Sequence, residues 1–411
     1  MTLIEFFDPN VNANIVSCLH LRPEKVVFLG DDPAMESSIE RYRTFFKERT
    51  MKIVLKPQHM QMRNIDQIAD DLLRVVRREA PCVIDVTGGD ERLLIAVGML
   101  LKQLSPELRK QVSVQKFDPE TGLAQDCDGD GKAIQGYPAE VTAKESVFLH
   151  YGLPSSSSDT LRTLYRAADL DPLWEIACDP KKHWNDVISA LIFLESRVNK
   201  NDRKLGRITL TEATLNALSS THSNSLQKAM DILDDFLNTG IIKGLISESC
   251  ITYHYTSPLY RHCTEKAGNI LEVKALLEAQ DILEKGKPYF NDCQMSVDII
   301  WEDPDNPDAK TNNEIDLILT RGLVSLFVSC KNGETNEEEL YKMNSVATRF
   351  GGLGAKKMMI ATELKITDGK SMEKFVQRAE SMGIHIVANA KSLKKADWRE
   401  EFKEAFIKRI R

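Results

Sequence analysis

Several features that mark common classes of protein are missing from this sequence of 411 residues. It has no run of about 18 apolar residues, the length from which a membrane-spanning helix is considered. Residues 1–5 carry no basic stretch ahead of an apolar one, so we expect no secretory signal. The eight cysteines include no CxxC pair, which argues against a zinc site and indicates reduced thiols. We therefore expect a soluble, cytoplasmic protein with no membrane partner.

An excess of positive charge is also missing, since the net charge is −7. The distribution is uneven, however. From Lys331 onward, 17 Lys plus Arg stand against 12 Asp plus Glu, a balance of +5, which leaves −12 for the first 330 residues. Because attraction to phosphate depends on the charge near the binding groove, the basic C-terminal part is compatible with nucleic-acid binding. A solvated helix face would carry the same charge, so composition leaves both interpretations open.

The length and a hydrophobic content of 42% are typical of a globular chain with two or three domains. The first 150 residues alternate short apolar segments with helical patterns. The apolar segments, which we expect to be strands, are residues 3–7, 25–30, 51–55 and 82–86. This alternation predicts an α/β, Rossmann-like domain whose parallel sheet is covered by helices on both faces. We also expect strands over residues 112–117 and 146–150, around a glycine-rich hairpin loop.

A serine-rich stretch at residues 155–158 indicates a linker. Residues 159–205 have helical patterns. Residues 209–255 follow the order helix, helix, apolar ribbon, which fits a winged helix-turn-helix and equally a plain helical connector. From residue 263 the pattern is α/β again. We therefore predict three domains: residues 1–154, residues 155–262 and residues 263–411.

The most informative segment contains two apolar strands joined by Arg321 and Gly322. Asp316 lies in the first strand, and Lys331 lies at the end of the second. A carboxylate and an ammonium inside apolar strands cost free energy unless they are paired or bind a metal. Such a pair suits phosphodiester hydrolysis, in which Asp316 holds a divalent cation and Lys331 orients the attacking water or stabilises the phosphate. Glu272, on the preceding predicted helix, can add a second carboxylate.

A second candidate site lies at the carboxyl end of the predicted N-terminal sheet. Thr87, Gly88 and Gly89 stand between a buried strand and a helix, where glycines let backbone N–H groups approach an anion. The loop with Asp8 and Asn10 reaches the same sheet edge. The glycines do not form a GxGxxG fingerprint, so they predict no conventional dinucleotide site. A tight strand-to-helix turn without any ligand is the alternative.

The order and spacing of these motifs resemble a known family. The segments that carry the resemblance are LRPEKVVFLG, DVTGG, GNILE, NEIDLIL, VSCKNG and the predicted helix over residues 340–352. They are similar to CRISPR-associated ancillary nucleases that fuse a CARF sensor domain to a PD-(D/E)xK restriction-endonuclease-like domain.

The resemblance implies a ligand, a cation and a substrate. A cyclic oligoadenylate, with cyclic tetraadenylate as the expected ring, would bind through the loops at Asp8 and Thr87 across the two-fold axis of a homodimer. The C-terminal domain would cleave DNA or RNA with Mg²⁺ or Mn²⁺, and the role implied is CRISPR antiviral defence.

One departure from the family pattern concerns Ser329, where an acidic residue is common two positions before the lysine. A hydroxyl is a poorer ligand for a hard cation than a carboxylate. Either Glu272, Glu314 or a backbone carbonyl completes the coordination, or the site is degenerate. A degenerate site would leave a ligand-controlled nucleic-acid-binding regulator that acts through residues 205–260. A constitutive nuclease with a purely structural N-terminal domain is a further alternative.

Overall fold

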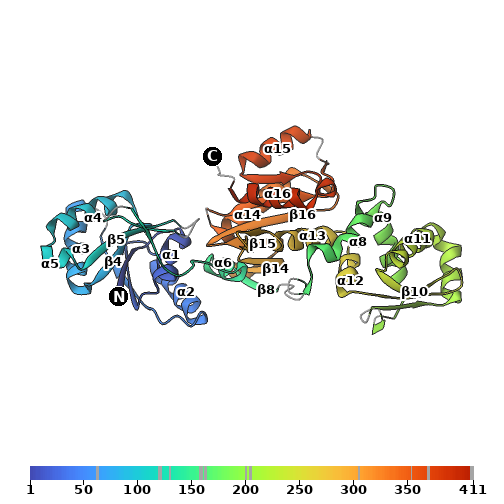
Figure 1. The fold of residues 1–411 in the computed structure, drawn as a ribbon, viewed down its shortest axis with the longest axis horizontal. Coiled ribbons are helices and arrows are strands. Elements are labelled where there is room, and N and C mark those ends of the chain that lie inside the picture. The colour runs from blue at the N-terminus through green and yellow to red at the C-terminus, as the bar shows by residue number, and fades with distance from the viewer. Residues whose placement is uncertain are drawn as a thin grey trace.

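The structure is a computed structural model that describes residues 1–61, 64–118, 123–128, 131–156, 161, 164–199, 201–202, 206–303, 306–352, 354–367 and 371–407. Figure 1 shows an elongated molecule with three parts in a row. Within the described residues, no helix combines the length and the apolar character that crossing a membrane requires.

The N-terminal part contains a seven-stranded sheet in the order β3-β2-β1-β4-β5-β6-β7. The first five strands run parallel, and the last two are antiparallel additions. The strands are β1 (Thr2–Phe6), β2 (Lys25–Gly30), β3 (Val54–His59), β4 (Cys82–Asp85), β5 (Val112–Phe117), β6 (Ala124–Asp126) and β7 (Ala133–Ile134). The helices are α1 (Val11–Leu21), α2 (Met35–Glu48), α3 (Ile65–Glu79), α4 (Glu91–Gln103) and α5 (Pro106–Arg109).

Two separate apolar clusters hold this sheet, one on each face. Helices α1 and α2 bury Ile15 and Phe45 against one face, and helices α3 and α4 bury Leu72 and Val97 against the other. Alternate residues of β1 divide between the two clusters, because successive side chains of a strand point to opposite faces. The predicted Rossmann-like domain with a doubly covered parallel sheet is therefore confirmed.

The strand predicted over residues 146–150 is wrong, because α6 (Ala143–Leu149) is a helix. Its start is set by a capping box: the Thr142 hydroxyl accepts from the Glu145 N–H, and the Glu145 carboxylate accepts from the Thr142 N–H. This polar signal at the N-terminus outweighs the apolar run that suggested a strand. Helix α6 packs between two parts of the molecule: Val147 belongs to the central apolar cluster, and Leu149 belongs to the cluster of α1 and α2.

The central part is built on a six-stranded sheet in the order β20-β18-β16-β15-β14-β8. Its strands are β8 (Leu153–Ser156), β14 (Asp292–Asp303), β15 (Asn306–Arg321), β16 (Val324–Lys331), β18 (Lys356–Ala361) and β20 (Ile384–Val387). Strands β8, β14, β15 and β16 pair antiparallel, whereas β16, β18 and β20 pair parallel. Short pairs decorate this part, namely β12 (Leu283–Glu284) with β13 (Lys287–Pro288) and β17 (Glu334–Thr335) with β19 (Lys365–Ile366).

Helices cover both faces of this central sheet. Helix α14 (Glu337–Gly351) and α6 bury Phe350 and Val147 against one face. Helices α13 (Asn269–Gln280) and α16 (Lys395–Ile407) bury Leu276 and Phe402 against the other. Helix α15 (Met372–Ser381) packs beside α14, and a short 3-10 helix, η1 (Ala390–Ser392), follows β20. The predicted second α/β fold is confirmed.

The third part begins with two helices and contains a small sheet in the order β10-β11-β9. Its elements are α8 (Ala167–Cys178), α9 (Trp184–Glu195), β9 (Arg207–Leu210), α11 (Glu212–Asn238), β10 (Ile242–Ile246), β11 (Ile251–Tyr255) and α12 (Pro258–Glu265). Helix α11 is interrupted at His222, where φ is −142°. The resulting order of helix, strand, two helical arms and hairpin is that of a winged helix.

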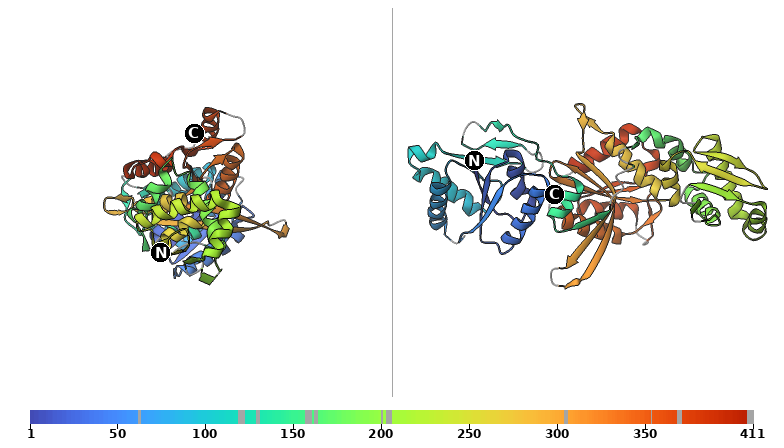
Figure 2. Two further views of the ribbon diagram at one scale, coloured as in Figure 1. Left: turned by 90° about the vertical axis from the view of Figure 1, so that its right-hand side faces the viewer. Right: turned by 90° about the horizontal axis from the view of Figure 1, so that it is seen from below.

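In space this third part does not connect the other two. Figures 1 and 2 show the central part between the N-terminal part and the winged-helix-like part. The central sheet takes β8 from the chain before residues 167–265 and β14 to β20 from the chain after them. The apolar core is also continuous from α9 into α13. The segment between the two α/β folds in the sequence is thus an appendage on the far side of the central part.

Candidate active site

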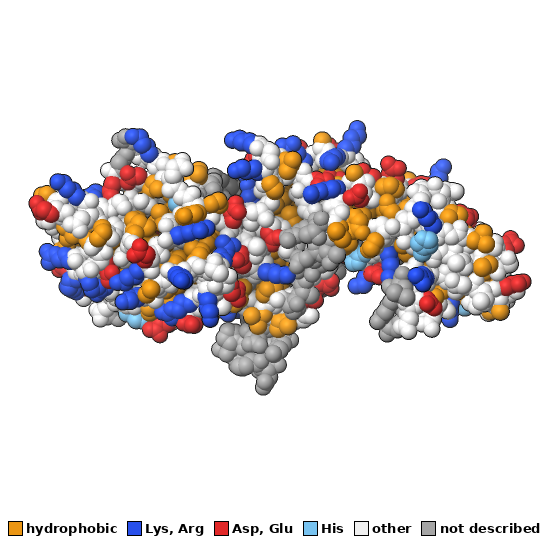
Figure 3. All heavy atoms as spheres, turned by 60° about the horizontal axis from the view of Figure 1, so that its bottom comes forward, with side chains coloured by type: hydrophobic (Ala, Val, Ile, Leu, Met, Phe, Trp, Pro, Cys, Tyr) orange, Lys and Arg blue, Asp and Glu red, His pale blue; other side chains and the backbone are white. Residues whose placement is uncertain are grey.

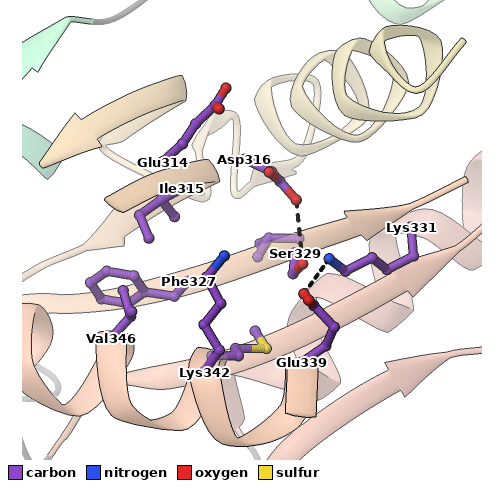
Figure 4. A pocket seen from close by; sticks show the side chains of 11 residues that line it. Glu314, Ile315, Asp316, Phe327, Ser329, Lys331, Glu339, Lys342 and Val346 are labelled. Atoms are coloured by element: carbon purple, nitrogen blue, oxygen red, sulfur yellow. Dashed lines mark hydrogen bonds and ion pairs between the residues drawn. The ribbon is translucent and has the colours of Figure 1, made fainter. Parts of the chain in front are cut away.

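The hairpin of β15 and β16 opens at the point where polar residues begin. The pairing of β15 with β16 runs from Arg321 opposite Val324, beside the turn, to Leu317 opposite Val328, where it ends. At the next position, backbone pairing between β15 and β16 gives way to hydrogen bonds from β16 to the Asp316 carboxylate. Its Oδ2 accepts from the Cys330 backbone N–H at 2.6 Å and from the Ser329 hydroxyl at 3.3 Å (Figure 4). A partly buried strand acid is therefore satisfied by the strand next to it, at the end of the apolar run.

Strand β14 is irregular at the same level. Its register with β15 passes from Met295 and Leu317 to Val297 and Ile315, omitting the residues between. The omitted residue of β14, Ser296, has φ of +51°. A residue other than glycine in this left-handed region is uncommon and signals a locally specified backbone. Asp316 thus stands where both neighbouring strands leave the regular ladder.

The Lys331 side chain turns to helix α14. Its Nζ lies 2.5 Å from Oε2 of Glu339, in the first turn of that helix. The hydrogen bond from Lys331 is the main cause that lowers the pKa of Glu339. Sequence reasoning missed Glu339, although Asn336 is a helix N-cap signal that places the acids after it in the first helical turn, close to the end of β16.

A cavity of about 70 Å³ opens between this strand end and α14. It brings together the predicted residues Glu314, Asp316, Ser329 and Lys331. Figure 4 shows Asp316 and Glu339 approaching Ser329 from opposite sides. The remaining lining residues are Ile315, Phe327, Val328, Lys342, Met343 and Val346. The cavity is polar at one end and apolar at the other.

Glu272 approaches the site from the opposite face of the sheet, on α13. Burial raises its pKa to about 7, and repulsion from Asp316 and Glu314 adds to the rise. The pKa of Asp316 is also raised, chiefly by burial. Among the described residues, these three carboxylates do not form a group whose oxygens all lie within 4.8 Å of one another. Glu272 is therefore an electrostatic neighbour of Asp316 but does not line the cavity.

The donor set fits a hard divalent cation. Carboxylate oxygens are the ligands that Mg²⁺ and Mn²⁺ favour in proteins. Like charges near one another in a desolvated place raise each other's pKa, and a bound cation removes that penalty. The raised pKa values of Glu272 and Asp316 indicate such a place.

The structure also brings together the two loops of the N-terminal candidate site. The Asp8 carboxylate accepts from the Gly89 N–H at 3.0 Å and from the Asn10 N–H at 2.7 Å. The Asn10 side chain in turn caps α1. The hydroxyl of Thr87 donates to Asp85 and accepts from the backbone N–H of Phe117. The backbone N–H of Gly89, which was expected to donate to a bound anion, thus donates to the carboxylate of Asp8.

The two glycines are required by internal packing. A Cβ atom at Gly88 would lie 2.9 Å from the Cβ atom of Asp8. Gly89 has φ of +89°, and its Cβ atom would lie 2.6 Å from Leu93. These contacts explain the glycines without a ligand, so they support the tight-turn alternative for this sequence pattern.

Two further acids lie beneath these loops. Glu5 and Asp85 are fully buried on the adjacent strands β1 and β4. Burial and repulsion from Asp85 raise the pKa of Glu5 well above its usual range, and burial raises that of Asp85 to about 6. Ser17 of α1 donates to Glu5 at 2.7 Å. In the sequence, each of these acids is a single charged residue within an otherwise apolar strand, the same pattern that identified Asp316.

No family model and no curated protein matches this chain. Protein VC1899 from Vibrio cholerae has a similar structure, with a TM-score of 0.68, 13% identity, and coverage of 98% of this chain and 97% of that one. Can2 from Sulfobacillus thermosulfidooxidans, solved in complex with cyclic tetra-adenylate, superposes with a TM-score of 0.62 at 14% identity, covering 98% of this chain and 99% of that one.

A type III CRISPR defence DNA nuclease activated by cyclic oligoadenylate has a TM-score of 0.48 at 14% identity, and the match covers 98% of this chain and 51% of that one. At such low identity the similarity to VC1899 and Can2 establishes the fold and leaves the activity open. Over nearly its whole length, the chain has the fold of VC1899 and Can2, and Can2 was solved with the class of ligand that the sequence resemblance implied.

Proposed function

We propose that this protein is a nuclease that hydrolyses DNA or RNA phosphodiester bonds with Mg²⁺ or Mn²⁺ and is controlled by a cyclic oligoadenylate. The observation that carries the proposal is Asp316, a desolvated carboxylate at the opened end of β15 and β16, with Glu272 and Lys331 near it. The similarity to Can2, solved in complex with cyclic tetra-adenylate, supports that ligand. The proposal includes a homodimer in which the loops at Asp8 and Thr87 meet the ligand.

Asp316 and Glu314, which line the cavity, would hold the cation, and Glu272 would add negative charge to the site from the opposite face of the sheet. A divalent cation there would supply Lewis acidity and lower the pKa of a water molecule. The ammonium group of Lys331 would stabilise the negative charge that develops on the phosphate oxygens. Lys342, whose side chain reaches into the same cavity, would bind a phosphate of the substrate (Figure 4).

A broad basic surface is not needed for this proposal. On the face drawn in Figure 3, the Lys and Arg side chains of the described residues are interspersed with Asp and Glu over the N-terminal and central parts. The positively charged side chains that would bind the substrate phosphates are those in the cavity, Lys331 and Lys342, because attraction to phosphate is local.

A direct contact links the sensor to the catalytic hairpin. The Asn12 side chain of α1 donates to the Leu323 carbonyl at 3.1 Å, across 311 positions of sequence. Leu323 forms the turn between β15 and β16 and is buried in the same cluster as Val11 and Ile15 of α1. Helix α1 begins directly after the loop with Asp8. A ligand that moves this loop would therefore move α1 against the hairpin that carries Asp316 and Lys331. Such control requires tighter binding to the active arrangement.

The experiment is a cleavage assay on full-length protein with Mn²⁺, Mg²⁺ or EDTA, each with and without cyclic tetraadenylate. The proposal expects cleavage only with metal, and at least about fivefold faster with the ligand, the lower range of allosteric coupling. Cleavage that is equally fast without ligand would favour a constitutive nuclease.

A nucleic-acid-binding regulator is the second candidate, favoured by the winged-helix order of residues 184–255 and by Ser329. It predicts no cleavage under any condition but ligand-dependent retention of a labelled DNA duplex. Removal of residues of the β10–β11 hairpin would then abolish retention, whereas a nuclease would keep its metal-dependent cleavage of short substrates.

A further inference from the structure

The cavity beside Asp316 is also lined by an acid that the sequence analysis did not identify, Glu339. Glu339 comes from helix α14, eight positions after Lys331, and is about one third exposed. Its carboxylate faces the Ser329 and Lys331 side chains (Figure 4). On β16 itself, the position across from Asp316 offers only the Ser329 hydroxyl. A hard cation at Asp316 needs further oxygen ligands, and carboxylates serve better than hydroxyls.

We propose that Glu339 is a ligand of the catalytic cation, so that the metal site is completed from helix α14 instead of strand β16. The proposal rests on the metal-dependent cleavage proposed above and adds a residue to it. Ser329 lies between the two acids: it donates to Asp316 at 3.3 Å, and the Glu339 carboxylate approaches it from the other side (Figure 4). Both carboxylates line one cavity of about 70 Å³, which suits a single ion with a few waters.

The ammonium group of Lys331 is the positive charge beside Glu339. Its Nζ lies 2.5 Å from the Glu339 carboxylate. A cation bound by Glu339 would compete for the same oxygen, and Lys331 would then be free to interact with the substrate phosphate. Metal binding and the placement of Lys331 would therefore be coupled.

Helix α14 is built to present this residue. Asn336 caps the helix by accepting from the Glu339 N–H, and fully buried Leu340 anchors the first turn in the core. The neighbouring Glu338 is exposed. Glu338 thus offers a matched control, with the same charge, the same helical turn and no place in the cavity.

The test measures binding of Mn²⁺ alone to the full-length protein by titration calorimetry. All variants carry Glu404→Gln, because His385, Glu401 and Glu404 are the group of the described residues that could hold a second ion. We expect Glu339→Gln to weaken Mn²⁺ binding at the Asp316 site by at least about tenfold. Glu338→Gln removes the same charge from the same helix end, but Glu338 is exposed and does not line the cavity, so Mn²⁺ affinity should stay within about twofold of the parent. The double variant Ser329→Glu with Glu339→Gln moves the carboxylate from helix to strand and should recover most of the affinity.

Parental Mn²⁺ affinity in Glu339→Gln, together with slower cleavage, would show that Glu339 only positions Lys331 and would overturn the proposal. Thermal melting checks that each variant is folded. If Glu339→Gln does not fold, Glu339→Asp replaces it and should still weaken Mn²⁺ binding; unchanged affinity there would again contradict the proposal. A parent that neither binds Mn²⁺ nor cleaves refutes the proposed function itself, which is a distinct result.

Discussion

Two regions of this molecule place carboxylates in or shortly after apolar strands, and the carboxylates have different surroundings in the two regions. In the N-terminal part, Asp85 accepts hydrogen bonds from Thr87, and Asp8 accepts one from Gly89. The polar groups of these loops therefore bond to acids of the protein itself. In the central part, Asp316 is held by one backbone N–H and a serine hydroxyl but opens onto a cavity with further charges. A buried acid alone does not mark a catalytic centre. Its surroundings decide whether it serves the fold or faces a ligand.

The largest expected effect separates these two kinds of acid. Asp316→Asn should slow metal-dependent cleavage by about a thousandfold or more, several kcal/mol of transition-state stabilisation, because the cation loses a charged ligand. Its melting temperature should change little. Asp85→Ala should do the reverse, because the Thr87 N–H and hydroxyl lose their acceptor: the free energy of unfolding should fall by about 1–3 kcal/mol, with cleavage retained. Single-turnover rates and thermal melts on both variants check this. Equal cleavage by Asp316→Asn and the parent would remove Asp316 from the site.

The next effect concerns pH. The pKa of Glu272 is raised from 4.5 to about 7 by burial, with repulsion from Asp316 and Glu314, while His262 and Lys266 act in the opposite sense. An acid whose pKa is higher in the folded state holds its proton more tightly there. Its ionisation therefore lowers stability as the pH rises from about 4.5 to 7. Glu272→Gln should lack this loss, which is on the order of 2–3 kcal/mol.

The measurement for Glu272 is the free energy of unfolding in urea between pH 4.5 and 8, without metal. Saturating Mn²⁺ should flatten the parental curve, since a cation offsets the same repulsion. Parallel curves for parent and variant would mean that Glu272 is not in the environment described.

A smaller effect tests the glycine turn of the N-terminal part. Gly89→Ala should lower the free energy of unfolding by about 2 kcal/mol, because a Cβ there meets Leu93 at 2.6 Å in a left-handed backbone. Gly240→Ala is the matched control, with φ of +77° and open space around its Cβ position. It should lose only about 1 kcal/mol. Urea titration of both variants measures the difference. An equal loss of unfolding free energy would mean that the Leu93 side chain moves away from the new Cβ atom at little energetic cost.

The smallest effect is on the link between the two regions. Asn12→Ala removes the hydrogen bond to Leu323 and should cost about 1 kcal/mol of stability. Stimulation by cyclic tetraadenylate should fall by about fivefold, while cleavage without ligand stays at the parental rate. Dose–response curves measure this. Full stimulation in the variant would show that the signal takes another route.

Much of the fold could be predicted because its signals are local. The βα repeats of the N-terminal part and the β15–β16 hairpin follow from periodicity and a short turn, so Asp316 and Lys331 were placed on the right strands. The error at residues 146–150 was local too, since the capping box at Thr142 was readable in the sequence. The domain limits and the roles of the site residues stay predictions.

The sequence by itself determined the βα repeats of the N-terminal part and the β15–β16 hairpin, where these apolar runs end in a charge, and that the C-terminal part carries the basic balance. Only the tertiary structure decided which charges meet. Glu339 reaches Lys331 because α14 folds back over the strand end, Glu272 approaches from the opposite face, and Leu323 meets Asn12 across 311 positions. The physical reason is range. Propensity and capping act over a few residues, whereas the environment of a buried charge depends on every element packed around it.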